Sequence, residues 1–99
     1  MRSKIQYTFT AELWQHAAAG GWHFFSLPQA MAAEIREQLQ WQEEGWGRLK
    51  ATARLGTSQW ETAIWFDTRR QTYLLPVRAA VRRREKIGAG DAASVSIWV

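Results

Sequence analysis

The sequence contains no cysteine, only two histidines and two prolines in 99 residues, and no long hydrophobic run. Without cysteine the chain has no disulfide, no thiolate nucleophile and no cysteine-ligated metal or iron–sulfur cluster. No segment approaches the ~20 apolar residues of a transmembrane helix, and polar residues interrupt the beginning of the chain, where a signal peptide requires an apolar core. We therefore expect a soluble protein of a reducing compartment, the cytoplasm, with no cofactor and no membrane partner.

Tryptophan is abundant by contrast, with seven residues in a chain that is 46% hydrophobic and 22% charged. These proportions are those of a globular protein, and the length suits a single domain spanning residues 1–99. Each large indole ring either fills core volume or leaves apolar surface for a partner. Trp14 and Trp65 fall on the outer faces of expected strands, so we select them as candidate interaction aromatics.

Alternating hydrophobicity predicts that most of the chain is β-strand. One helix is expected after a Ser26–Gln29 capping box, ending before Gly45, and a second is expected from Val77 to about Glu85, opened by Pro76. The expected fold class is α+β, mainly β: a small barrel or half-barrel of about six strands, with two short helices covering its openings or edges. The strands are expected at 5–14, 22–25, 48–55, 60–66, 71–75 and 93–98.

Two hairpins follow from these strands. The first joins segments 5–14 and 22–25. The second and clearer one joins 48–55 to 60–66 through a four-residue loop, and matching the inward faces sets Leu55 opposite Trp60. On its outer face the predicted pairs are Arg54 with Glu61, Arg48 with Asp67, and Lys50 with Trp65.

Several short motifs occur in an order that resembles a known family. They are FTAEL at 9–13, GW at 21–22, FSLP at 25–28, YLLPVRAAVR at 73–82 and GD at 90–91. This order resembles DUF1905, a small bacterial domain of unknown function. The resemblance implies a compact β-barrel-like fold and no assigned activity, and its C-terminal elements look like those of swapped-hairpin DNA-binding regulators and antitoxins.

Positive charge is concentrated in the second half of the chain, which carries nine Lys/Arg and four Asp/Glu, against four and five in residues 1–49. Arg78, Arg82 and Lys86 form one i, i+4, i+8 row of the expected second helix, a pattern that could neutralise phosphates. A solvated helix face explains the same pattern and is favoured. The candidate nucleic-acid or anion-binding residues are Arg69, Arg70, Arg78, Arg82, Arg83 and Lys86.

Catalytic and metal-binding patterns are weak. His16 and His23 lie near the first hairpin, where Glu12 is the nearest candidate partner, but a metal site needs three or four ligands and we interpret both histidines as incidental. Glu43 and Glu44 are adjacent in an expected loop and are interpreted as solvated, because paired catalytic carboxylates face each other. No nucleophile motif or phosphate-binding glycine loop is evident. We assign no catalytic, cofactor-binding or metal residue.

The expected function is therefore binding or interaction without chemistry. The first hypothesis is a module for a small ligand or a protein partner, in which surplus tryptophans line a cleft or interface. The alternative is a nucleic-acid-binding module that uses the basic second helix, and an enzyme ranks third. The sequence leaves the ligand and the choice between monomer and dimer open.

Overall fold

The computed structural model describes residues 4–17, 20–45 and 47–99. All strand pairs are antiparallel, and the sheet order is β1-β7-β4-β5-β6-β3-β2. The helices are α1 (Gln29–Leu39), the short 3-10 helix η1 (Gln40–Gln42) and α2 (Ala79–Glu85). The strands are β1 (Gln6–Glu12), β2 (Trp14–Gln15), β3 (His23–Ser26), β4 (Arg48–Leu55), β5 (Ser58–Asp67), β6 (Thr72–Pro76) and β7 (Ala92–Trp98).

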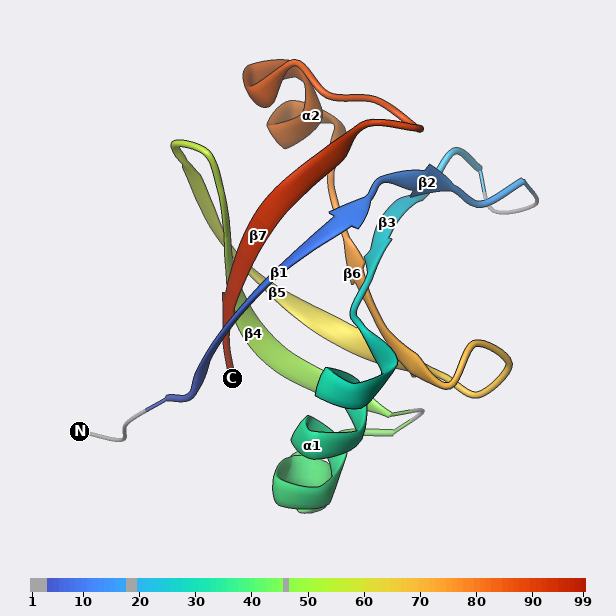
Figure 1. Cartoon of the computed structure of the whole chain (residues 1–99), viewed down its shortest axis with the longest axis vertical. Helices are drawn as coiled ribbons and strands as arrows, with labels where there is room; N and C mark the ends of the chain where they lie inside the picture. The colour runs from blue at the N-terminus through green and yellow to red at the C-terminus, as the bar shows by residue number, and fades with distance from the viewer. Residues whose placement is uncertain (1–3, 18–19, 46) are drawn as a thin grey trace.

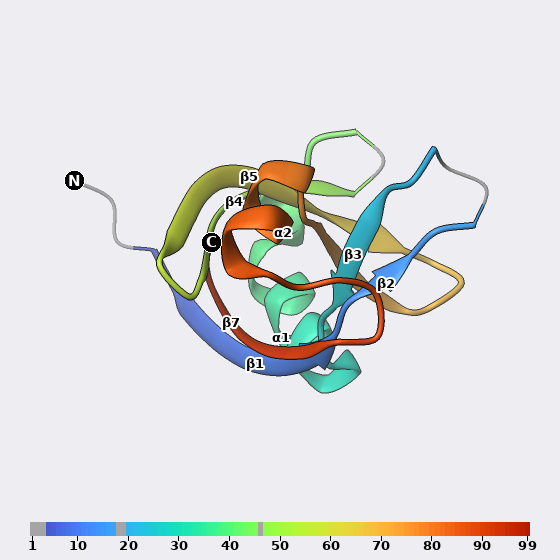
Figure 2. The ribbon, with the colours of Figure 1, turned by 90° about the horizontal axis from the view of Figure 1, so that it is seen from above.

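The sheet curls into a half-barrel around a single hydrophobic cluster (Figures 1 and 2). In Figure 1, α1 lies across the lower opening and α2 across the upper one. The expected fold class, a mainly β half-barrel with two short helices, is therefore confirmed. Among the described residues, no helix is long and apolar enough to cross a bilayer.

A bend at Leu13 joins the two ends of the strand order, because β1 and β2 are consecutive in the chain. The Leu13 side chain is fully buried. Its N–H donates to the Asp91 carbonyl at 2.9 Å, and its own carbonyl accepts the Gly90 N–H at 2.8 Å. The predicted first hairpin is consequently wrong over most of its length. β1 pairs along its whole length with β7, and only the two residues of β2 pair with β3.

The β4–β5 hairpin forms, but its register differs by two residues from the predicted one. Leu55 pairs with Ser58 across a two-residue turn, and Ala53 pairs with Trp60. Gly56 has a φ of 59°, and glycine at the first central position is what such a tight turn requires. Because the shift is even, the inward faces are preserved. The predicted outer-face pairs of opposite charge, in contrast, do not form.

The helix starts also differ from prediction. α1 buries the expected row that includes Ile35 and Leu39, but its N-cap is Pro28 and no side chain caps it. The Ser26 hydroxyl instead accepts the Trp14 Nε1–H at 2.9 Å, so the capping box is wrong. Pro76 does not open α2 either. Pro76 is the last residue of β6, and the N–H of the following Val77 still donates to the His23 carbonyl of β3, so the chain remains extended there.

Candidate functional site

The sheet opens between β5 and β6. The two strands pair over three residues each, and the pairing ends at Trp65↔Leu74. Continuing that register by two residues would set Pro76 opposite Ala63, and proline has no N–H with which to extend the ladder. From this point the two strands separate, and a pocket occupies the gap beneath the start of α2.

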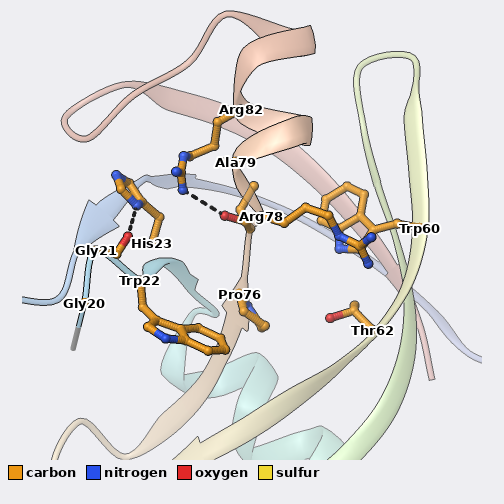
Figure 3. A pocket seen from close by; sticks show the side chains of 11 residues that line it. Gly20, Gly21, Trp22, His23, Trp60, Thr62, Pro76, Arg78, Ala79 and Arg82 are labelled. Carbon is orange, nitrogen blue, oxygen red and sulfur yellow. Dashed lines mark hydrogen bonds between the residues drawn. The ribbon is translucent and has the colours of Figure 1, made fainter.

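The pocket has a volume of about 400 Å³ (Figure 3). Four segments that are distant in sequence supply its walls: the turn before β3, the middle of β5, the end of β6 and the start of α2. Its lining residues are Gly20, Gly21, Trp22, His23, Trp60, Thr62, Pro76, Val77, Arg78, Ala79 and Arg82.

Aromatic and apolar surfaces form much of the wall. Trp22 is 57% exposed and stacks on Phe24 with ring centroids 6.0 Å apart and an interplanar angle of 17°. Trp60, in contrast, is 8% exposed and belongs to the core. Sequence reasoning missed Trp22, because it was placed within a buried strand. The signal that points to it is the preceding glycine pair, Gly20 and Gly21, whose positive φ values of 56° and 86° place Trp22 at a turn.

Two arginines supply the charge of the pocket. Arg82 Nη1 donates to the Val77 carbonyl at 3.1 Å, and Arg78 Nη2 lies 3.4 Å from the Glu61 carbonyl. Both acceptors are neutral backbone groups. No carboxylate occurs among the described residues that line the pocket, and neither guanidinium is paired with a carboxylate of the described chain. The site is therefore positively charged and retains hydrogen-bond donors, since a guanidinium carries five N–H groups.

His23 adds a polar group with a defined tautomer. Its Nδ1 lies 2.6 Å from the Gly21 carbonyl oxygen. A carbonyl only accepts hydrogen bonds, so Nδ1 carries the proton and, in the neutral ring, Nε2 is the acceptor. Together these groups suit recognition of a ligand with both an apolar part and a polar part.

A second, shallower hollow of about 440 Å³ adjoins the pocket and shares Trp22, Thr62 and Pro76 with it. Its two cations, Arg48 and Lys50, are paired with Glu44, whereas Glu61 accepts a hydrogen bond from the Thr52 hydroxyl. Arg48 Nη1 lies 2.6 Å from Glu44 Oε1 and stacks over the Trp65 ring at 5.7 Å. This hollow therefore contributes apolar surface next to the pocket more than unpaired positive charge.

A family model matches nearly the whole chain. The family is described as a domain of unknown function, DUF1905, and the match spans residues 9–97. The chain belongs to the DUF1905 family. No curated protein matches it. Every described residue of the pocket lining falls within the matched segment, so the pocket is part of the DUF1905 domain itself.

The candidate basic residues of this DUF1905 domain do not share one surface. Arg69 and Arg70 follow Asp67, at the far end of β5, where Arg70 Nη1 pairs with Asp67 Oδ2 at 2.8 Å. α2 lies at the other end, where Ser58 donates to Glu85 Oε2 at 2.6 Å. A ten-residue strand rises roughly 30 Å. Figures 1 and 2 both show the turn after β5 well away from α2, so Arg69 and Arg70 do not form one basic surface with the arginines of α2.

The predicted helical row is also broken. Arg78 is the N-cap residue of α2, and Lys86 follows the helix with a left-handed φ of 56°, so only Arg82 of the row is helical. Arg78 and Arg82 line the pocket instead of extending along a helix face. Arg83 and Lys86 are exposed beside them.

The two candidate tryptophans differ in their surroundings. Trp14 lies 5.2 Å from the Phe24 ring, is covered by the Arg70 guanidinium at 4.3 Å, and donates to Ser26. Its role is to pack β2 against neighbouring segments. Trp65 is 38% exposed and borders the second hollow, so it remains a surface aromatic.

The paired glutamates also separate. Glu44 is exposed, whereas the Glu43 side chain is 9% exposed, so its interpretation as solvated is wrong. Glu43 accepts a hydrogen bond from Tyr73, and its Oε2 lies 3.4 Å from Arg36 Nε without hydrogen-bond geometry. Burial, and then the Glu43 carboxylate, raise the pKa of Tyr73. This cluster closes the α1 end of the half-barrel.

Neither histidine joins a metal site in the part of the chain that the structure describes. Residues 4–17, 20–45 and 47–99 contain no group of three or more His, Cys, Asp or Glu side chains arranged to hold an ion. The His16 ring lies 6.1 Å from the Trp14 ring. Of the two histidines, His23 is the one that reaches the pocket.

Proposed function

We propose that this DUF1905 domain is a binding module for a small ligand and that the pocket between β5 and β6 is its site. The observation that carries the proposal is the opening of the sheet at Pro76, which leaves about 400 Å³ between aromatic walls and two arginines. Pockets of ~300–1,000 Å³ with apolar walls and a few polar groups are typical of small-molecule sites. The proposal is binding without chemistry, in the cytoplasm, for which a cysteine-free sequence is suited.

The distribution of basic residues favours a small ligand over nucleic acid. Phosphate-backbone binding needs a continuous basic surface, because its affinity rises with the number of phosphates neutralised. Arg70 is paired with Asp67 at one end of β5, while Arg78 and Arg82 line a pocket near the other. Cations confined to one pocket suit a small anion better than an extended backbone.

A ligand screen with a matched pair of variants tests the proposal. A library of small metabolites is screened by thermal unfolding, since a ligand at 100 times its Kd stabilises the folded state by about 2.7 kcal/mol. Each hit is then repeated on Ala79→Phe and Ala80→Phe. Both residues are exposed and helical. Ala79 belongs to the described lining of the pocket, and Ala80 does not.

We expect Ala79→Phe to fill part of the pocket and abolish the stabilisation, and Ala80→Phe to preserve it. Stabilisation that survives Ala79→Phe unchanged would place the ligand elsewhere and overturn the assignment of the site. A library without any hit would count against a small ligand and in favour of a protein partner.

A further inference from the structure

Arg36 at one end of the half-barrel and the two pocket arginines at the other have different kinds of partner. At the α1 end, Arg36 lies over the Phe66 ring, 3.8 Å from its centroid, and beside the chain's own Glu43 carboxylate. At the pocket, Arg78 and Arg82 also lie among aromatic residues, but the partners that the structure gives them are backbone carbonyls. The pocket thus has cations and aromatic rings, as the Arg36 site does, but no carboxylate lies in its described lining.

Electrostatics favours an oxyanion as the ligand of Arg78 and Arg82. Two guanidinium groups border a concave site whose described lining contains no acid, and in Figure 3 Arg82 extends toward His23 while Arg78 extends toward Trp60. Low-dielectric walls strengthen the field of such charges and raise the local concentration of anions. Guanidinium groups also form paired, charge-assisted hydrogen bonds with carboxylate and phosphate oxygens.

The shape of the walls favours a planar body attached to that anion. Figure 3 shows Arg82 at the α2 end of the pocket and the Trp22 ring toward the opposite end, with Pro76 beside the ring. Trp22 is exposed and already stacks on Phe24, so it offers a supported flat surface. Flat aromatic ligands stack on such rings at distances comparable to those of aromatic pairs in proteins.

We infer that the pocket binds a planar aromatic oxyanion, with its carboxylate or phosphate at Arg82 and its ring against Trp22, while Arg78 adds positive charge from the β5 side. The inference rests on the proposed function and specifies the class of its ligand. Carboxylate and phosphate share the same recognition chemistry here, so the experiment includes one probe of each.

The test is a set of NMR titrations of the full chain at pH 7 with probes that differ in one property. The probes are 2-naphthoate, 2-naphthyl phosphate, the neutral 2-naphthamide and the non-planar cyclohexanecarboxylate. We expect 2-naphthoate to bind about tenfold more tightly than 2-naphthamide, since a charge-assisted contact is worth about one such factor, and more tightly than cyclohexanecarboxylate. Tighter binding of the phosphate than of the carboxylate would support the inference and identify the preferred anion.

Variants of the arginines test whether the preference for 2-naphthoate over 2-naphthamide comes from the pocket. Arg82→Gln should weaken 2-naphthoate about tenfold and leave 2-naphthamide unchanged, whereas Arg78→Gln should weaken 2-naphthoate less, because Arg78 reaches toward β5. Arg83→Gln, an exposed change on the same helix outside the described lining, should alter neither. An unchanged backbone spectrum of each variant shows that the fold is retained.

The failures of the two proposals are distinguishable. Equal affinities for 2-naphthoate and 2-naphthamide would overturn the anion selectivity while leaving a binding pocket in place. Equal affinities for 2-naphthoate and cyclohexanecarboxylate would overturn the planar part of the inference. Absence of binding by all four probes would overturn the inference, and would overturn the proposed function as well if the metabolite screen is also negative.

Discussion

The two ends of the half-barrel combine the same residue types and use them differently. At the α1 end, Arg36 and Tyr73 meet Glu43, and the Phe66 ring lies under Arg36, so cation, aromatic rings and carboxylate all come from one chain. At the α2 end, the arginine–aromatic combination borders a pocket of about 400 Å³ without a carboxylate in its described lining. An arginine therefore stabilises the fold where the chain supplies its counter-ion. Where the chain does not, its guanidinium keeps N–H donors that no carboxylate of the described residues accepts.

The largest effect that tests this comparison is expected at Glu43. Glu43→Ala should lower the free energy of unfolding by about 2–3 kcal/mol, because it leaves the Tyr73 hydroxyl and the Arg36 guanidinium without their carboxylate. Arg36 is 32% exposed, and water moderates its part of this loss. Urea unfolding of the variant beside the wild type measures the change.

The neighbouring carboxylate is the control. Glu44 is exposed and pairs with Arg48 at the surface, so Glu44→Ala should cost about 0.5 kcal/mol or less. Similar losses for the two variants would show that the α1 end is no more tightly closed than an ordinary surface pair.

A backbone change tests how the α2 end is held. Gly56 has a φ of 59°, and a Cβ there would run into the Glu85 carboxylate, which accepts the Ser58 hydroxyl hydrogen bond. Gly56→Ala should therefore cost about 1–2 kcal/mol in thermal unfolding experiments. Gly88→Ala is the matched change, since no heavy atom lies within 4 Å of its added Cβ and its φ is not in the left-handed region. A loss as large in Gly88→Ala would refute the explanation.

Alkaline pH should affect the α1 end through Tyr73. Burial and the Glu43 carboxylate raise the pKa of Tyr73 above its ordinary value of 10.0. The pKa of Tyr73 is higher in the folded state than in the unfolded state. The stability that protonated Tyr73 contributes is therefore fully present below pH 10 and is lost as the pH rises toward the folded-state pKa. The free energy of unfolding of the wild type should therefore decline above pH 10.

Tyr73→Phe removes this titration. We expect a loss of about 1 kcal/mol at pH 7, from the missing hydrogen bond, and a shallower decline above pH 10. Part of the decline should remain, because burial and Glu34 also raise the pKa of Tyr7. Parallel pH profiles of variant and wild type would show that Tyr73 does not contribute to the alkaline decline.

The smallest effect on stability is expected at the pocket. Arg82→Gln should change the free energy of unfolding by less than about 0.5 kcal/mol, because Arg82 has one backbone carbonyl as its partner and no ion pair among the described residues. A loss above 1 kcal/mol in urea unfolding would mean that Arg82 completes the fold, as Arg36 does, and would remove the contrast between the two ends.

Much of the fold was predictable because alternation along a strand reports which side chains face the core. The inward row of β4, including Leu49 and Leu55, is buried as expected, and so is Ile35 in α1. The pairing partners of the strands were less predictable. β1 pairs with β7 from the other end of the chain, and a two-residue turn at Gly56 set the hairpin register.

The candidate site was predictable only in part. Arg78 and Arg82 were candidate anion-binding residues, with a solvated helix face favoured, and both line the pocket, whereas Arg69 and Arg70 lie beyond the far end of β5. Trp22 was missed, since hydrophobicity alone does not separate a core tryptophan from one at a turn. The local hydrophobic pattern indicates that a side chain tends to be buried, but it does not indicate which segments cover the Trp22 ring.

The sequence by itself determined the mainly β class, the inward faces and the absence of cysteine chemistry, because these depend on composition and on contacts close along the chain. The tertiary structure decided the rest. Pro76 opens the sheet only because the β5–β6 register would bring it opposite Ala63, and Arg82 lacks a counter-ion only because no described acid faces it across the pocket. Both depend on segments far apart in sequence, whose relative placement is set by the packing of the whole core and not by any local pattern.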